Sequence, residues 1–589
     1  MRLKKPIIAA STVALLALAA CGGGGNGGNP ANEKNTPIEG GGAGQGQDPT
    51  RTEGPAKEID GAQEGGTVTV SSINGLNSMD PTEAYYTNTA SILSNLVTRS
   101  LTQYVYVDGQ MVLIPDLATD LGTPNDDYTE WKFTIRDGIK YENGQEVTAD
   151  DVAYGIKRSF DRATFPEGAS YSNDYFLDGD KYKGPYTSGE DYAGVEVNGM
   201  ELTLKMATPF PDMAFWGAFP AIGPIPKGKD SDPAKYANHP WATGPYKFEE
   251  GGYTPEKSLT LVKNDQWDPA TDPGRHQYVD GYDMTFDVPS AKIDQTLLKD
   301  QGEAQTTLSF DNITAPNYLQ YKQDSPDRLV IGSDPCTFMW FPDYRKITNI
   351  EVRKALAFAY PYIDAINAGG NIEGVTRTPG TNIMPPGIPG REEYNPLDGH
   401  EVGETDADTA KQMLKDAGET GYEIKFLYAT DDPLSVDVKD TIKAALEDAG
   451  FKATPVASTV AEFSTLRADP NADINVRSGG WCSDWPTGGS WFPPVFQSSP
   501  NLDEEGLGAN YAVFSEKAVD DQIGEIQKMP VEDQPAAWNE IDQTIQTEFF
   551  PVFVTAYGGV AMMHGSKVNG MEVDNTFGMP TWKDIWLTQ

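Results

Sequence analysis

The stretch "WKFTIRDGIKYENGQEVTADDVAYGIKRS", Trp131–Ser159, contains both periodicities of a mixed α/β protein. Its first residues alternate apolar and polar, which is typical of a half-buried strand. Further on, Thr148 and Asp151 stand three residues apart, as in a capping box, and predict the start of a helix. Val152 and Ile156 then lie one turn apart on one face of that helix. The stretch therefore predicts a strand followed by an amphipathic helix.

Similar signals continue on both sides of this stretch. Val195–Met206 alternates around an Asn-Gly pair, which predicts a two-residue β-hairpin. A helix that starts at Glu351 is expected to stop at Pro361. Between residues 405 and 456, helical segments that end in glycine alternate with short strands, which indicates βαβ-type packing. The expected fold class is α/β.

Length and charge narrow the classes of function. A chain of 589 residues is expected to hold about two to four domains. It has 45 basic against 87 acidic residues, a formal net charge of −42. That charge argues against nucleic acid and anionic lipid surfaces as partners. The plainest interpretation of the charge is a well-solvated secreted surface.

The N-terminus predicts export. Three basic residues precede the apolar run Ile7–Ala20, which is too short to span a bilayer and suits a signal peptide over residues 1–20. The run ends in Leu-Ala-Ala-Cys, which resembles the bacterial lipobox, so Cys21 is expected to carry a lipid anchor. An ordinary signal peptide followed by a chance cysteine is the alternative.

The segment after Cys21 is expected to be a tether. Residues 21–66 are rich in Gly, Asn, Gln, Pro and Glu and nearly free of apolar side chains. Such a composition cannot bury a core, so the segment is predicted to be disordered. The folded body would then begin near Gly66.

Catalytic and metal-binding patterns are not found in the sequence. It has no GxSxG, Walker or HExxH motif, and its four histidines are scattered. No metal or cofactor is expected, although a paired-carboxylate hydrolase stays open. If Cys21 is lipidated, Cys336 and Cys482 remain, and an even pair outside the cytoplasm predicts one disulfide. Two buried free thiols are the alternative.

Several segments together resemble one known family, the extracellular solute-binding proteins of family 5, which are peptide and nickel receptors of ABC importers. The opening stretch carries the most specific part of this resemblance. Further matching segments run from Ser78 to Trp485: "SMDP" at Ser78, "IPDLATDLG" at Ile114, "ATGPYKF" at Ala242, "NIEVRKALAFA" at Asn349, "DTAKQMLKDAG" at Asp408 and "GWCSDW" at Gly480.

The resemblance implies a type II periplasmic-binding fold, with two lobes that close on a cleft and an extra domain inserted in the first lobe. The expected lobe I is discontinuous, over residues 67–97, 239–333 and 557–589. The inserted domain would cover 98–238, and lobe II 334–556. The lobes would close on hinges around a captured solute.

The resemblance also implies a binding site in the loop "RSGGWCSDWPTGGSW", 477–491. In oligopeptide-binding members an aspartate of this loop binds the α-ammonium of the peptide, which places that role on Asp484. The same members tie the loop by a disulfide that corresponds to Cys336–Cys482. Trp481 and Trp485 would form aromatic walls of the site.

Two positions depart from the pattern. Tyr85 stands where the oligopeptide receptors have a glutamate that faces an arginine before the loop, and Arg477 is the arginine available here. Arg477 lies one residue further from Trp481 than in the family loop. Both are kept as candidate ligand-binding residues, with a cleft wall that differs from the family's.

The sequence thus predicts a lipid-anchored, monomeric receptor that captures peptides and has no catalysis of its own. Its expected partners are the permease subunits of an ABC importer and their ATPase, and the membrane through the lipid on Cys21. It would sit on the outer face of the plasma membrane, or in a periplasm. The alternatives are another solute (an oligosaccharide, a metal chelate or a siderophore) and, in another class, a surface hydrolase or a signalling receptor.

Overall fold

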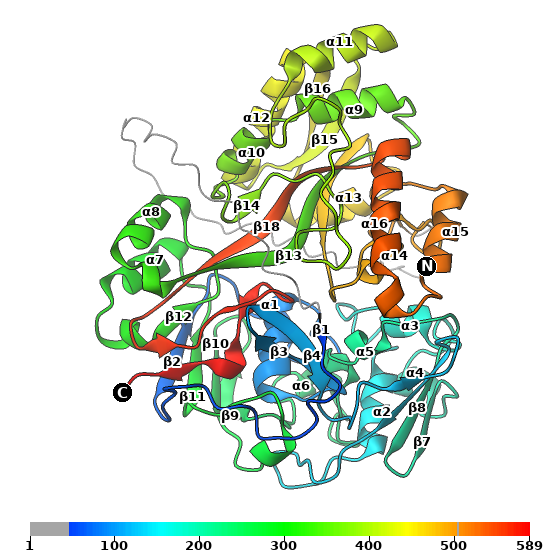
Figure 1. Ribbon diagram of the computed structural model, residues 1–589. Coiled ribbons are helices and arrows are strands. Elements are labelled where there is room, and N and C mark those ends of the chain that lie inside the picture. Colours follow the sequence, from blue (N-terminus) through cyan, green and yellow to red (C-terminus); the bar gives the residue numbers. More distant parts are fainter. Residues whose placement is uncertain (1–45, 503–505) are drawn as a thin grey trace, which may run out of the picture.

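The computed structural model describes residues 46–502 and 506–589, which form a mixed α/β protein of two lobes (Figure 1). Two long strands, β13 (Leu329–Pro342) and β18 (Phe553–His564), run through the centre. In Figure 1 they connect the part that holds β2 and β10–β12 with the part that holds β15 and β16. The expected α/β two-lobed fold is confirmed.

One nine-stranded sheet forms the spine, in the order β17-β13-β18-β12-β2-β11-β10-β9, with β14 on β18. β13 and β18 pair antiparallel along most of their length, but the register shifts between Ser333 and Thr337. The extra residues of β13 at this shift face fewer residues of β18, so the sheet is interrupted there. This interruption lies where the chain is expected to pass between the lobes.

The three segments expected to form lobe I supply one end of this sheet. They also share one hydrophobic core, to which the C-terminal segment contributes. Tyr282 and Trp582, for example, meet edge to face in that core. The elements of these segments are β2 (Thr67–Ser71), α1 (Thr87–Ile92), β9 (Tyr246–Thr254), β10 (Ser258–Lys263), β11 (Gly281–Thr285), α7 (Ser290–Lys299), β12 (Thr307–Ser309), α8 (Ala315–Asp324), β19 (Val568–Asn569), β20 (Val573–Asp574), β21 (Met579–Pro580) and β22 (Trp586–Leu587).

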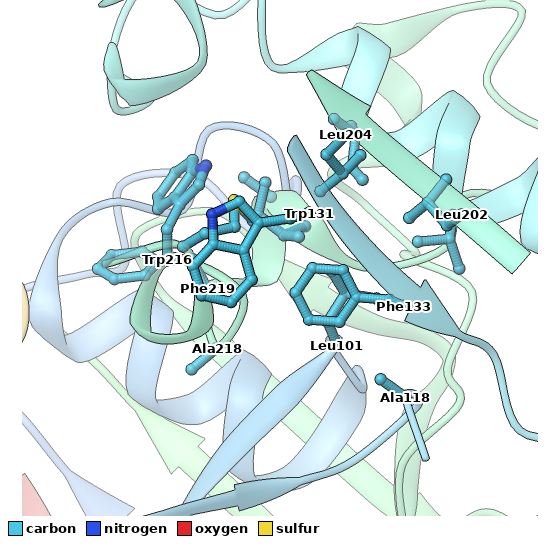
Figure 2. Close-up of a cluster of buried hydrophobic side chains, with 14 of the residues drawn as sticks. Leu101, Ala118, Trp131, Phe133, Leu202, Leu204, Trp216, Ala218 and Phe219 are labelled. Carbon is cyan, nitrogen blue, oxygen red and sulfur yellow. The ribbon is translucent and has the colours of Figure 1, made fainter. Parts of the chain in front are cut away.

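The segment expected to be the inserted domain has its own sheet, in the order β5-β6-β8-β7, and its own aromatic core. Trp131 and Phe133 lie opposite Leu204 and Leu202 across β6 and β8, as Figure 2 shows. The elements are β3 (Thr102–Val107), β4 (Gln110–Pro115), β5 (Thr123–Pro124), β6 (Glu130–Thr134), α2 (Ala149–Arg158), α3 (Tyr171–Tyr175), α4 (Pro185–Ser188), β7 (Val195–Asn198), β8 (Glu201–Lys205), α5 (Met213–Trp216) and α6 (Pro233–Tyr236).

The local predictions for this segment are confirmed. Thr148 and Asp151 make both hydrogen bonds of a capping box at the start of α2. β7 and β8 form the expected antiparallel hairpin, although Asn198 pairs with Glu201, so the two turn residues are Gly199 and Met200 rather than Asn198 and Gly199.

The segment expected to be lobe II packs helices around β15 and β16, which pair in parallel as the βαβ prediction requires. α9 ends before Pro361, also as predicted. The elements are α9 (Ile350–Ala359), α10 (Tyr362–Ala368), β14 (Arg377–Thr378), α11 (Ala407–Ala417), β15 (Glu423–Ala429), α12 (Pro433–Asp448), β16 (Lys452–Ser458), α13 (Val460–Ala468), β17 (Val476–Cys482), α14 (Phe492–Phe496), α15 (Lys517–Ile526) and α16 (Pro535–Thr544).

The predicted start of the folded body at Gly66 is wrong, because residues 46–66 already make hydrogen bonds to the folded body. β1 (Gly46–Gln47) pairs in parallel with β4, and the Arg51 side chain donates to the carbonyl of Pro273 at 3.1 Å. The backbone N–H of Ile59 donates to the hydroxyl of Tyr278. Hydrogen bonds rather than apolar burial hold this segment, and composition alone does not detect them.

The other expectations for the N-terminus and the domains remain predictions. The signal peptide and Cys21 lie outside the described residues. In the two described stretches, no helix combines the length and the apolar character that crossing a bilayer requires. The boundaries of the lobes and the inserted domain stay as predicted from the resemblance, and their names are kept below for those segments.

Candidate functional site

The loop that follows β17 is tied to the central sheet by a disulfide. β17 pairs antiparallel with β13, and this register places Cys482 opposite Cys336. The two cysteines, 146 residues apart in sequence, are joined, which confirms the predicted disulfide over the two free thiols. The bond fixes the end of β17, and with it the start of the loop 483–491, at the interruption between β13 and β18.

Asp484 is held by two tyrosines from other parts of the chain. The Tyr85 hydroxyl donates to Asp484 Oδ2 at 2.9 Å, and the Tyr171 hydroxyl donates to the same oxygen. Tyr85 follows the Asp80-Pro81 turn of lobe I, and Tyr171 opens α3 of the inserted domain. The backbone N–H of Asp484 donates to Ser490 Oγ, within the loop. Three separate segments therefore meet at one carboxylate.

This carboxylate is only partly exposed, and its environment changes its acidity. Burial raises the pKa of Asp484 to about 7, although the hydrogen bonds from Tyr171 and Tyr85 act in the opposite direction. Burial and the neighbouring Asp484 charge raise the pKa of both tyrosines well above their usual value, so their hydroxyls stay protonated and donate. A cation beside Asp484 would favour its ionised form.

Trp485, the next residue, points into the inserted domain. Its ring is 1% exposed and belongs to the same aromatic core as Phe219. The ring centroid lies 4.6 Å from that of Tyr171 and 6.1 Å from that of Phe210. Its indole N–H donates to Asp212 Oδ2 at 2.9 Å. In this conformation Trp485 is therefore a contact between the lobe II loop and the inserted domain, with no open face for a solute.

Asp212 receives a second bond from the same loop. The Thr487 hydroxyl donates to Asp212 Oδ2 at 3.0 Å. Burial raises the pKa of Asp212 to about 6, while the two hydrogen bonds lower it. Asp212 thus serves as a common acceptor for two side chains of the loop.

The remaining two candidate residues lie on the lobe II side. Trp481 is partly buried against a lobe II core, and its indole N–H donates to the carbonyl of Ser490. Arg477 is buried, forms an ion pair with Asp343 Oδ2 at 3.0 Å, and donates to the carbonyls of Arg467 and Tyr511. Its described contacts are all within lobe II, and the structure does not bring it together with Tyr85.

Sequence reasoning missed Tyr171 and Asp212. Asp212 carried one weak signal, a carboxylate flanked by apolar residues in "PFPDMAFW" from Pro209 to Trp216. Such an acid is expensive to bury without donors, so its neighbours imply a partner elsewhere. The identity of that partner, more than 270 residues further along the chain, follows only from the fold.

One cluster has the spacing of a metal site. Among the described residues, the only such group of His, Cys, Asp or Glu side chains is Asp334, Cys336 and Cys482. Both cysteines are consumed by the disulfide, so they offer no thiolate to an ion.

Comparison with known proteins points to one family. Residues 112–503 match the profile described as bacterial extracellular solute-binding proteins, family 5 Middle. The chain is 25% identical over 335 residues to the oligopeptide-binding protein OppA of Bacillus subtilis (strain 168), a match that covers 54% of this chain and 57% of that protein. It is 22% identical over 395 residues to the periplasmic OppA of Salmonella typhimurium (strain LT2), covering 64% and 68%. It is 21% identical over 472 residues to the glutathione-binding protein GsiB of Escherichia coli (strain K12), covering 76% and 81%.

Solved structures show the same fold. The clavulanic acid biosynthesis oligopeptide binding protein 2 superposes with a TM-score of 0.80 at 22% identity, over 90% of this chain and 96% of that one. The periplasmic binding protein DppA from Helicobacter pylori, solved with the peptide STSA, gives 0.67 at 18% identity, over 90% and 99%.

Proposed function

Because the chain belongs to the bacterial extracellular solute-binding proteins of family 5, we propose that it is the peptide-binding receptor of an ABC importer. The receptor captures a peptide between its lobes and delivers it to membrane permeases driven by an ATPase. It performs no chemistry on the peptide. Two curated relatives are named for oligopeptide binding, and one structural neighbour was solved with a peptide, which supports this class of solute.

The observation that carries the proposal is the Asp484 carboxylate. It is partly buried at the meeting of three segments, and its described hydrogen bonds come from two neutral hydroxyls, both on Oδ2. Hydrogen bonds from neutral groups compensate a buried carboxylate incompletely, as the raised pKa of Asp484 indicates. The α-ammonium of a peptide supplies the missing positive charge, and a charge-assisted hydrogen bond in such a site is strong.

Tyr85 and Tyr171 are positioning residues in this proposal. Their two bonds direct Oδ2 toward the hydroxyls, which leaves Oδ1 for the ammonium. Trp481 provides apolar area on the lobe II side of the same loop. Arg477 is left out of the site, since its guanidinium already has acceptors inside lobe II.

We place the receptor on the outer face of the bacterial plasma membrane, or in the periplasm where an outer membrane exists. The lipobox-like ending at Cys21 supports a diacylglyceryl anchor there. Residues between Cys21 and the first described strand at Gly46 then link the anchor to the folded body.

Native mass spectrometry of the full chain, purified without added solute, tests the proposed function. The expected result is a population of the protein that is heavier by the mass of a short peptide. Fragmentation of the released solute should give a peptide sequence. Free-amine tripeptides to pentapeptides and glutathione would then be titrated as defined probes. Retention of a sugar or a metal chelate, with no binding of any peptide probe, would contradict the proposal.

A further inference from the structure

The loop that carries Asp484 also holds the two lobes together through contacts that involve no solute. Trp485 and Thr487 belong to the lobe II loop, whereas their acceptor Asp212 and the rings around Trp485 belong to the inserted domain. A third bond between these bodies runs from Gln527 of lobe II to the hydroxyl of Tyr175 at 3.2 Å. The contact is therefore specific and spans several residues.

Trp485 inserts into a group of side chains of the inserted domain, which is called the socket below: Tyr171, Phe210, Asp212 and Phe219. The Trp485 indole is fully buried among Tyr171, Phe210 and Phe219, and its one polar atom meets Asp212. Opening the lobes would return this large apolar surface to water. Tryptophan is enriched among the residues that contribute most to protein interfaces, and its N–H usually has a hydrogen-bond partner when it is buried.

The backbone of the loop fits the same socket closely. A Cβ at Gly489 would lie 2.2 Å from Asp212 Oδ2, closer than any side chain tolerates. Glycine at this position therefore lets the loop approach Asp212. The approach is needed only when the lobes are together, since the two residues belong to different bodies.

We propose that Trp485, with Asp212 as its acceptor, is a latch that holds the lobes closed and gives the receptor a closed population before any solute arrives. Burial of the Asp212 carboxylate opposes this closure and limits its strength, so that the lobes can reopen to release a solute. The latch adds the same increment of affinity to every solute that the closed form accepts, because it does not touch the solute. This role rests on the proposed receptor function, while the latch contacts themselves do not.

The lobe positions can be measured directly in the full chain without solute. Spin labels at Lys181→Cys of the inserted domain and Lys517→Cys of lobe II would report the distance between the lobes, and both positions are well exposed. The chain would carry Cys21→Ser so that only these two cysteines react. Pulsed electron paramagnetic resonance then gives the fractions of short and long distances.

Two variants with matched controls separate the latch from general loss of packing. Trp485→Phe keeps a ring in the socket and removes the donor, and it should lower the closed-to-open ratio about tenfold. Trp267→Phe, which removes an indole N–H bond of 3.1 Å to another carboxylate, Asp272 Oδ2, inside lobe I, should leave the ratio unchanged. Gly489→Ala should lower the ratio about tenfold or more by collision with Asp212, whereas Gly524→Ala, where a Cβ meets nothing within 4 Å, should not.

The latch proposal is contradicted if the wild type shows only the long distance between the labels. It is also contradicted if Trp485→Phe and Gly489→Ala give the same distance distribution as the wild type. This readout requires no solute, so it stands even if the protein binds no peptide. If peptides do bind, both variants should release free-amine and acetylated peptides faster by one common factor. A factor that differs between the two peptides would assign Trp485 to the solute site instead.

Discussion

Replacing Asp484 by Asn removes the charge proposed to meet the α-ammonium and keeps the shape of the side chain. The variant should bind a free-amine peptide more weakly, because the ammonium is then desolvated without an anion. It should bind the N-acetylated form of the same peptide nearly as the wild type does, since that form brings no charge.

The expected size follows from the position of Asp484. Two unit charges about 3 to 4 Å apart, at the effective dielectric of a protein surface, attract by about 4 to 5 kcal/mol. Because the pKa of Asp484 is about 7, about half of the protein must lose a proton on binding at pH 7, which costs about 0.4 kcal/mol. Desolvation of both charges lowers the net gain further. We therefore expect Asp484→Asn to cost about 2 to 4 kcal/mol, or roughly 30- to 1,000-fold in Kd.

Isothermal titration calorimetry of both peptides against wild type and variant measures this coupling as a double-mutant cycle. Asp473→Asn is the matched control. It removes the same charge at a lobe II position away from the site, where the Asp473 side chain is 87% exposed. Without peptide, the melting temperature of Asp484→Asn should stay or rise, since burial of the charged carboxylate is unfavourable. Equal binding of free and acetylated peptide by the wild type would refute the role of Asp484.

Three further predictions concern pH, the anchor and the disulfide. Burial places the pKa of the solute-free Asp484 carboxyl near 7 and a bound ammonium lowers it, so the affinity for free-amine peptides should fall by up to about tenfold per pH unit below 7, with no such fall for acetylated peptides. The affinity should be highest between about pH 7 and 8, because the α-amino group of the peptide, with a pKa of about 7.7 to 8.0, loses its own proton above that range. Calorimetry between pH 5 and 8 checks this, and a flat profile would contradict it. Cys21→Ser should release the protein from membranes or leave the precursor uncut; membrane fractionation with an unchanged mature mass would show that Cys21 carries no lipid. Denatured, unreduced protein should leave Cys336 and Cys482 unalkylated, and labelling of both by mass spectrometry would show that the disulfide is absent in solution.

Local sequence signals predicted much of the fold because they act over a few residues. The capping box at Thr148 and the hairpin after Asn198 depend on neighbours within a few residues, and both formed, the hairpin with its turn one residue further along than predicted. The tether prediction failed over residues 46–66 because backbone pairing with β4 leaves little trace in composition. Such long-range hydrogen bonds depend on where the partner strand lies.

Only part of the site could be predicted from the sequence, because the residues that complete it come from distant parts of the chain. The resemblance led to the loop and to Asp484, and the cysteine count led to the disulfide. The loop sequence did not show that Trp485 turns away from Asp484 into the aromatic core of the inserted domain. Tyr171 and Asp212 come from that domain, and only the folded chain brings them to the loop.

A crystal structure of the protein with its co-purified solute, or with a bound free-amine peptide, tests the central claim most directly. The account predicts the N-terminal nitrogen of a peptide within about 2.7 to 3.0 Å of the Asp484 carboxylate, with the Tyr85 and Tyr171 hydroxyls still on Oδ2. A solute bound away from Asp484, or one that presents an uncharged group to it, would contradict the account.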